Sequence, residues 1–241
     1  MRHRVAIALV ALVAAAARPV GRTPIVAAQA AAQPRGTAAL AAPASTTFHG
    51  CPPEGAGKDP LLDGLKNRVD EGPYTPMEFD TIINLPWPPG VGGRVRDRWK
   101  TRDRHAVERY EGRPVAVEGF IGGLKREKPE ATNCYQISES MRDYHIALVP
   151  VANDSAPDAI VAEVTPRVRA NHPAWRFDRL EQLQAARQRI RVSGWLMLDQ
   201  AHPDQLGVRR ATLWEVHPVM RVELRARDGR WIALDSLPPR P

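Results

Sequence analysis

The chain has 241 residues, of which 43% are hydrophobic and 25% are charged, and its formal net charge is +7. This apolar share is that of an ordinary globular protein, and 17 Gly and 23 Pro are too few for a low-complexity chain. Composition therefore excludes a mainly disordered protein. It predicts one core-forming domain that folds without a metal or a dense disulfide framework.

Residues 1–30 predict an export signal. A basic start with Arg2 and Arg4 is followed by an uncharged, largely apolar run over residues 5–17, which is typical of a secretory signal peptide. The run is shorter than the roughly 18–20 apolar residues that a membrane span needs. We expect cleavage after Ala30, which gives a periplasmic or secreted protein without a transmembrane segment in the mature chain.

The basic charge is concentrated in two parts of the chain. Cleavage after residue 30 removes four arginines and lowers the net charge from +7 to +3, so the high isoelectric point is a weak argument for nucleic-acid binding. A second basic stretch is typical either of a phosphate-binding segment or, as we favour, of a solvated helix face. Its basic residues are Arg94, Arg96, Arg98, Lys100, Arg102 and Arg104.

Two segments precede the predicted core domain. Residues 31–47 are rich in Ala, Pro, Ser and Thr, which predicts a disordered linker. Residues 48–110 contain many Pro and Gly breaks and predict an N-terminal extension with short helices. One helix is expected over residues 60–69, where Pro60 suits the first helical position. Another is expected over residues 95–110.

Residues 111–237 predict a mainly β domain. β-Branched and alternating apolar residues predict five strands, with an additional edge strand near residues 231–234 and a helix over residues 176–188. The five strands are expected at residues 115–121, 144–149, 160–165, 190–198 and 212–224. A helix between strands three and four is the element order of the five-stranded OB-fold barrel. A β-sandwich does not need this helix, and a parallel α/β fold needs more helices.

Cys51 and Cys134 are the two cysteines of the chain. In an exported protein they are able to form a disulfide that ties the N-terminal extension to the loop after the first strand. Spacing alone does not establish that they are close in space, so paired and unpaired cysteines both remain open. Neither lies in a nucleophile motif, which argues against a catalytic thiol.

Three predicted strands each carry an acid followed two residues later by a histidine or a threonine. These pairs are Asp143 and His145, Glu163 and Thr165, and Glu215 and His217. Because side chains alternate along a strand, both members of a pair point to the same face. The second, third and fifth strands are neighbours in the predicted barrel. We therefore expect one contiguous polar surface in the region where such barrels bind ligands.

The favoured interpretation of this surface is an exported binding module for a polar or anionic ligand. An oligonucleotide, a glycan or a protein is compatible with it, because charged groups and tryptophan rings recognise all three. The predicted ligand-binding residues are Asp143, His145, Glu163, Thr165, Arg167, Trp195, His202, Glu215 and His217.

Two other interpretations remain open. His145, Glu163 and His217 together offer two imidazoles and a carboxylate to a divalent metal that activates water, as in a metal-assisted hydrolase or nuclease. No spacing matches a recognised metal motif, so this is the second hypothesis, and a divalent metal is its one cofactor. Alternatively, the facing acids, histidines and arginines satisfy one another, in a structural or interaction protein of the cell envelope.

Several segments of the chain resemble a group of uncharacterised exported bacterial proteins. The similar segments are 143–148 (Asp-Tyr-His-Ile-Ala-Leu), 161–167, 192–202, 212–218 and, near the N-terminus, 49–55 and 65–68. The resemblance covers residues 49–234. It implies export and an OB-fold-like domain, and it brings no established activity.

Overall fold

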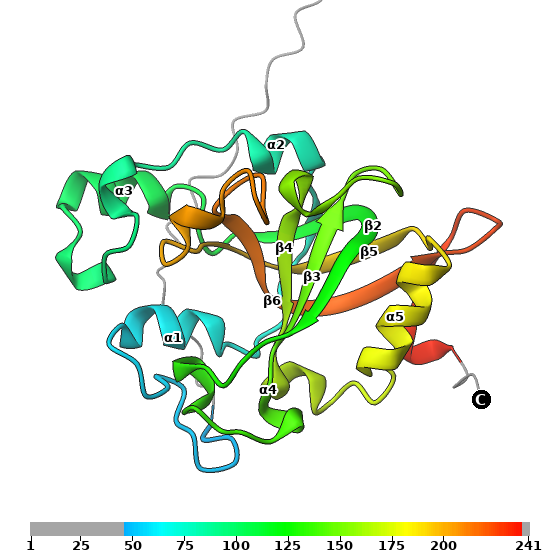
Figure 1. Ribbon diagram of the computed structural model, residues 1–241, viewed down its shortest axis with the longest axis horizontal. Coiled ribbons are helices and arrows are strands. Elements are labelled where there is room, and N and C mark those ends of the chain that lie inside the picture. Colours follow the sequence, from blue (N-terminus) through cyan, green and yellow to red (C-terminus); the bar gives the residue numbers. More distant parts are fainter. Residues whose placement is uncertain (1–45, 238–241) are drawn as a thin grey trace, which may run out of the picture. The chain divides into compact units, whose positions relative to one another are not determined.

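The computed structural model describes residues 46–237. Within this range the chain forms a closed five-stranded barrel with two extra strands and few helices (Figure 1). The predicted signal peptide over residues 1–30 lies outside the described residues, as does most of the predicted linker over residues 31–47. None of the helices described here has the length and apolar character needed to cross a membrane.

The barrel strands follow one another in the order β2, β3, β4, β6 and β5, and pairing of β5 with β2 closes the barrel. Their bounds are β2 Pro114–Arg126, β3 Tyr144–Val149, β4 Ile160–Val164, β5 Ile190–Leu198 and β6 Trp214–Arg225. All barrel pairs are antiparallel except β4 with β6. Helix α5 (Phe177–Ala185) lies between β4 and β5 in the chain. The predicted OB-fold-like barrel, with its helix between the third and fourth strands, is confirmed.

The remaining elements surround this barrel. The short strands are β1 (Thr75–Pro76), which pairs with β2, and β7 (Trp231–Ala233), which pairs with β6. The other helices are α1 (Pro60–Lys66), α2 (Phe79–Ile83), α3 (Thr101–Glu108) and α4 (Pro166–Arg169). Turns of 3-10 helix lie at Pro89–Val91, Arg96–Arg98, Ala131–Asn133, Glu139–Met141, Ala156–Asp158, Pro203–Gln205 and Leu234–Ser236.

The helix predicted over residues 95–110 is shorter in the structure. Residues 96–98 form a separate 3-10 turn, and α3 begins at Thr101. The turn directs Arg96 inward, where its guanidinium forms a bidentate ion pair with Glu111 at 2.5 and 2.7 Å. The interpretation of the basic stretch as one solvated helix face is therefore wrong at Arg96, which is buried.

The core fills the interior of the barrel with alternate residues of each strand. Ile146, Val164, Leu196 and Val216 are fully buried there, as the period of two predicts. Gly194 permits a close approach between β5 and β6, because a Cβ at this position would overlap the carbonyl oxygen of Pro218. The outward residues of the same strands are free to carry polar chemistry.

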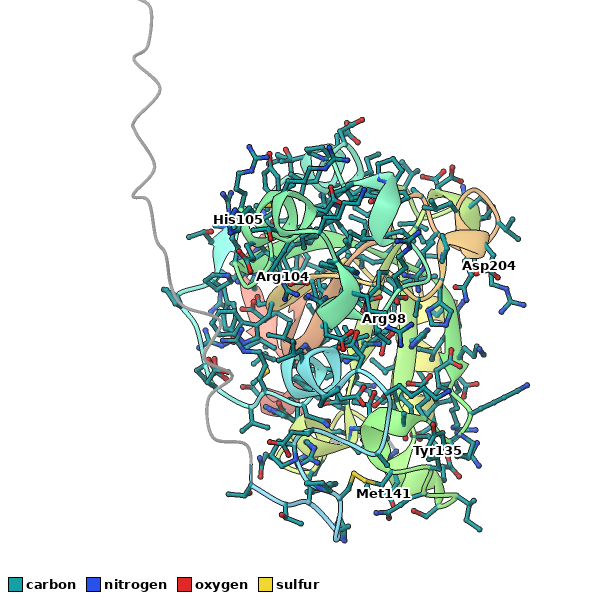
Figure 2. The ribbon with its side chains drawn as sticks, turned by 90° about the vertical axis from the view of Figure 1, so that its left-hand side faces the viewer. Arg98, Arg104, His105, Tyr135, Met141 and Asp204 are labelled. Atoms are coloured by element: carbon teal, nitrogen blue, oxygen red, sulfur yellow. A yellow bond between two sulfur atoms is a disulfide. The ribbon has the colours of Figure 1, made fainter. Side chains whose placement is uncertain are left out.

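Helix α1 packs on the outer face of the barrel. Asp59 caps the helix by accepting a hydrogen bond from the Leu62 amide at 3.2 Å. Leu62 and Leu65 pack against Met197 of β5 and form a small apolar cluster separate from the barrel core. Figure 2 views the molecule from the side that carries α1 and shows this helix in front of the strands, with Arg104 and His105 of α3 above it.

Two further interactions fasten the N-terminal extension to the barrel. Cys51 and Cys134 form a disulfide, with the sulfur atoms 2.05 Å apart. The Arg167 guanidinium of α4 donates hydrogen bonds to the carbonyl oxygens of Thr46, Cys51 and Pro52 at 2.7–2.8 Å. The extension is therefore held on the barrel by covalent, polar and apolar contacts together.

We predict that the double variant Cys51→Ser, Cys134→Ser unfolds at a lower urea concentration than the wild type. The disulfide joins residues 83 positions apart, and opening so long a loop costs about 2–4 kcal/mol of unfolding free energy. Urea denaturation without a reductant measures the difference. Wild type treated with a reductant should approach the variant, and equal unfolding free energies of oxidised wild type and variant would contradict the prediction.

Candidate functional site

The structure brings the three predicted acid-containing pairs to the outer face of the barrel. Tyr144, Val164 and Val216, the residues between the pair members, all lie in the barrel core. Their neighbours in the chain consequently point outward. In the antiparallel pairing of β3 with β4, His145 stands directly opposite Glu163.

Glu163 is the centre of this face. Its side chain is only 2% exposed, and its two oxygens face two different imidazoles. Oε1 lies 2.5 Å from Nε2 of His145, and Oε2 lies 3.0 Å from Nδ1 of His217. The three residues expected to converge therefore do so, with one carboxylate bridging two histidines.

Each histidine also meets a second acid. Nδ1 of His145 lies 3.0 Å from Glu127, whose other oxygen accepts a hydrogen bond from Lys125 at 2.6 Å. Nδ1 of His217 lies 3.1 Å from Oε1 of Glu215. The pairing of acid with base thus continues beyond Glu163 in both directions.

The chain of contacts ends on the other side at His202. Oε2 of Glu215 lies 3.3 Å from the Arg210 guanidinium, which also contacts Asp199 at 2.9 Å. Asp199 in turn lies 2.7 Å from Nδ1 of His202. We call this series the charged ladder. Its members are Lys125, Glu127, His145, Glu163, His217, Glu215, Arg210, Asp199 and His202.

The charged ladder is buried in its middle and reaches solvent at both ends. The side chains of Lys125 and His202 are 49% and 42% exposed, whereas Glu163, Glu215 and Arg210 are almost fully buried. Acids and bases alternate along it, so every charge has a neighbour of opposite sign. Such alternation is what buried charges require, because an unpaired one is strongly destabilising.

The electrostatics of the ladder favour charged forms at its centre. Burial raises the pKa of Glu163, but the adjacent His145 and His217 outweigh it and hold that pKa well below its usual range. Burial likewise lowers the pKa of His145, yet Glu163 and Glu127 raise it well above the ordinary value. Glu163 and His145 therefore form a carboxylate and imidazolium pair.

Lys66, at the end of α1, also interacts with this face of the barrel. The residue is only 7% exposed. Burial lowers its pKa, but the carboxylates of Glu163, Glu215, Asp199 and Glu130 raise it above the ordinary value. Within residues 46–237 it forms no direct ion pair with any of them. The Lys66 ammonium therefore compensates the charge of several acids without forming an ion pair with a particular one.

Two more acids crowd Glu163 on the side of the disulfide loop. Asp143, Glu130 and Glu163 each place an oxygen within 4.8 Å of the others. Burial, followed by repulsion from Glu163, raises the pKa of Asp143 and brings that of Glu130 to about 8. Asn133 donates hydrogen bonds to both Asp143 oxygens at 3.2 Å. This part of the face carries more acid than its bases balance.

Three predicted ligand-binding residues form contacts within the protein, one with α4 and two with the extension. Thr165 caps α4 by accepting from the Val168 amide at 3.5 Å. Arg167 holds the N-terminal segment, as described above. The indole of Trp195 donates to the Asp70 carbonyl at 3.1 Å, and the Arg68 guanidinium lies 3.4 Å from its ring centroid. The polar face expected to be open is covered by the extension.

The geometry offers metal ligands that differ from the predicted trio. Both ring nitrogens of His145 face carboxylates, so this residue has no nitrogen available for a metal. Two other sets place one ligand atom per residue within 4.8 Å of each other. They are Glu163, Glu215 and His217, and Glu130, Asp143 and Glu163.

A pocket of about 440 Å³ lies beside the barrel, between α4 and α5. It is separate from the ladder and contains none of its members. Its lining residues are Arg126, Glu139, Tyr144, Arg169, His172, Pro173, Trp175, Arg176, Phe177 and Asp178. We call it the arginine pocket, after its three guanidinium groups.

Sequence reasoning missed Lys66, Glu127, Glu130, Asp199 and Arg210. Each reaches the ladder region from a segment outside the paired strand positions, so strand periodicity contains no signal for it. Asp199 lies three residues before His202, and this short spacing is the one signal that could have found it. The fold and the charged ladder together define the protein as an OB-fold-like barrel with a buried charged network on its outer face.

Comparisons with protein-family models, curated proteins and solved structures found no match.

We predict that His202→Gln removes a pH-dependent part of the stability. The hydrogen bond to Asp199 raises the pKa of His202 despite partial burial. Its stabilising effect is therefore fully present below the unfolded pKa of about 6.5 and is lost as pH rises through the folded pKa. Because the side chain is partly exposed, we expect a loss below about 1 kcal/mol in acid and none in alkali.

Urea denaturation at pH 5.5 and pH 9 measures this difference. His105→Gln is the matched control, because His105 is exposed on α3. A His202→Gln effect of the same size at both pH values would show that the charge of His202 does not contribute.

Proposed function

We propose that the protein binds a small anionic ligand in the arginine pocket. The observation that carries this proposal is the convergence of Arg126, Arg169, Arg176 and His172 on one pocket of about 440 Å³. This is the size range of small-molecule sites. Guanidinium groups recognise phosphate and carboxylate oxygens through paired, charge-assisted hydrogen bonds.

Arg169 is the member best suited to an anion. Its guanidinium donates to the carbonyl oxygens of Arg142 and Ser140 at 2.9 and 2.8 Å. Its positive charge is therefore held in place without a carboxylate in direct contact. Burial lowers the pKa of this guanidinium, so a bound anion would compensate a partly desolvated charge.

Aromatic rings fix the positions of the pocket's cations. The guanidinium of Arg126 lies 3.9 Å from the ring centroid of Phe177, and that of Arg169 lies 3.8 Å from the centroid of Tyr144. His172 stacks on Trp175 at 3.9 Å. The rings of Phe177 and Tyr144 are thus already covered on one face by guanidinium groups, which favours recognition by charge over stacking of a base.

The acids of the pocket leave it with a surplus of positive charge. Arg126 pairs with Glu139 at 2.9 Å, and Arg176 pairs with Asp178 at 2.7 Å. Both pairs are exposed, so an incoming phosphate exchanges with their carboxylates at little cost. The indole Nε1 of Trp175 is buried and has no hydrogen-bond partner among the described residues. This favours a compact phosphorylated or carboxylated ligand, or the charged end of a larger one.

Metal-assisted hydrolysis by His145, Glu163 and His217 is the second candidate function. The observation in its favour is the Glu163 carboxylate between two imidazoles. It ranks second because the extension covers this face and His145 has both nitrogens paired. Hydrolysis of a phosphodiester that stops on addition of a chelator would favour it over simple binding.

We also propose that the protein acts in the periplasm or after secretion. The Cys51–Cys134 disulfide supports this location, because such bonds persist mainly in oxidising compartments. Fractionation of cells that express the full chain tests it, and the expected result is a processed protein outside the cytoplasm.

We predict that Arg126→Gln with Arg176→Gln strongly weakens anion binding, although Arg169 remains, and leaves the fold intact. Both arginines lie in exposed ion pairs, and such pairs contribute little to stability. The probe is tripolyphosphate at low ionic strength, measured by calorimetry and by its effect on the melting temperature. Wild type should gain melting temperature, and added salt should reduce the gain.

Arg230→Gln is the matched control for this experiment. Arg230 lies in a similar exposed pair with Asp228 on the turn before β7, at 2.8 Å, and does not line the pocket. It should bind tripolyphosphate as wild type does. Absence of any effect on wild type, or equal binding by the double variant, would overturn the proposed site.

A further inference from the structure

Glu163 belongs to two groups of three residues, and in each group the possible ligand atoms lie close enough together to hold an ion. One set contains Glu215 and His217, and the other contains Glu130 and Asp143. Because the two sets share Glu163, this carboxylate stands between two potential coordination positions. The first set combines two carboxylates with an imidazole, the donor types that Mn²⁺ and Zn²⁺ accept.

An unsatisfied carboxylate oxygen gives an independent sign of a missing partner. Oε2 of Glu163 is buried and accepts no hydrogen bond among the described residues. It lies 3.0 Å from Nδ1 of His217, but that nitrogen forms its hydrogen bond with Glu215. One N–H does not satisfy both acceptors, so Oε2 is left with a full lone pair directed into the protein.

Lys66 provides a second independent sign. Its ammonium is attracted by Glu130, Glu163 and Glu215, which represent both sets. It is more than nine-tenths buried and yet forms no direct ion pair within the described residues. The acids around Glu163 therefore favour a positive charge nearby, although none of them forms a direct ion pair with the Lys66 ammonium.

We propose that Glu163, Glu215 and His217 form a divalent-cation site and that Lys66 of α1 competes with the cation for it. The Lys66 ammonium, which is part of the extension, takes the place of the cation as a singly charged group. Like charges repel strongly at short distances in a protein interior. The site therefore binds Mn²⁺ or Zn²⁺ tightly only when the ammonium moves away or is removed.

This inference does not depend on the arginine pocket. The pocket and the site share no residue, and one is cationic while the other is acidic. Arg126→Gln with Arg176→Gln should leave metal binding unchanged. A failure of the pocket hypothesis therefore leaves the metal site standing, and the reverse also holds.

Lys66→Met is the decisive variant. Methionine keeps much of the apolar stem of lysine and removes the charge. After treatment with a chelator and its removal, calorimetric titration with MnCl₂ and with ZnCl₂ at pH 7 measures binding. We expect the variant to bind one ion at least about tenfold more tightly than wild type, since a repelling charge has been removed. Its melting temperature should rise more with Mn²⁺ than that of wild type.

Three further variants define the site. Glu163→Gln added to Lys66→Met should abolish the gain in affinity, because an amide is a much weaker ligand than a carboxylate. Lys66→Arg keeps the charge and should bind as weakly as wild type. Lys100→Met, which removes an exposed lysine next to α3, should have no effect.

Two results obtained with folded variants would overturn the proposal. One is a folded Lys66→Met variant that binds neither ion more tightly than wild type does. The other is tight binding that persists after Glu163→Gln. If Lys66→Met does not fold alone, refolding with Mn²⁺ decides the question, because the cation then replaces the ammonium. Recovery of the fold supports the site, and a failure to recover it shows that Lys66 is only structural.

Discussion

The burial of the Glu163 carboxylate is the constraint on which the outer face of the barrel depends. Removing an ionised carboxylate from water costs several kcal/mol unless charged partners compensate it. His145 and His217 are those partners, but each becomes a buried polar group that needs an acid of its own. Arg210 and Asp199 likewise need partners of opposite charge, because they are buried too. The series of ion pairs ends where Lys125 and His202 reach solvent. The length of the charged ladder is thus set by the extent of the covered surface.

The covering extension is stable only because the barrel holds it. Helix α1 has seven residues, too few to persist alone in water. It gains stability from the packing of two leucines on Met197, from the disulfide and from Arg167. In return it buries the ladder and delivers Lys66 to the acids around Glu163. The extension and the charged ladder therefore depend on each other. Without the extension the ladder would be an ordinary solvated surface, and without ion pairs among the ladder residues their burial under the extension would be destabilising.

Strand periodicity was enough to predict the barrel and the centre of the ladder. Tyr144, Val164 and Val216 are apolar and face the core, so the acids and histidines beside them had to share the outer face. It was not enough to predict what lies on that face. Lys66 lies at the end of the short helix α1 and Glu130 lies directly before a 3-10 turn. Their interactions with Glu163 join residues far apart in the chain. The arginine pocket has the same origin, because the loop between α4 and α5, together with the start of α5, contributes most of its lining. Local patterns fix which way a strand residue points, whereas the docking of irregular segments is decided by long-range packing.

Strand β3 connects the two sites of opposite charge. Tyr144 and His145 are consecutive residues that point to opposite faces, one beneath Arg169 in the pocket and the other in the ladder. Asp143, the residue directly before this strand, interacts electrostatically with Arg169 and also with Glu163. The Asp143 carboxylate therefore interacts with an acid of the ladder and with a guanidinium of the pocket. The alternation of side chains along one strand thus separates an acidic face from a cationic pocket, because consecutive residues point in opposite directions.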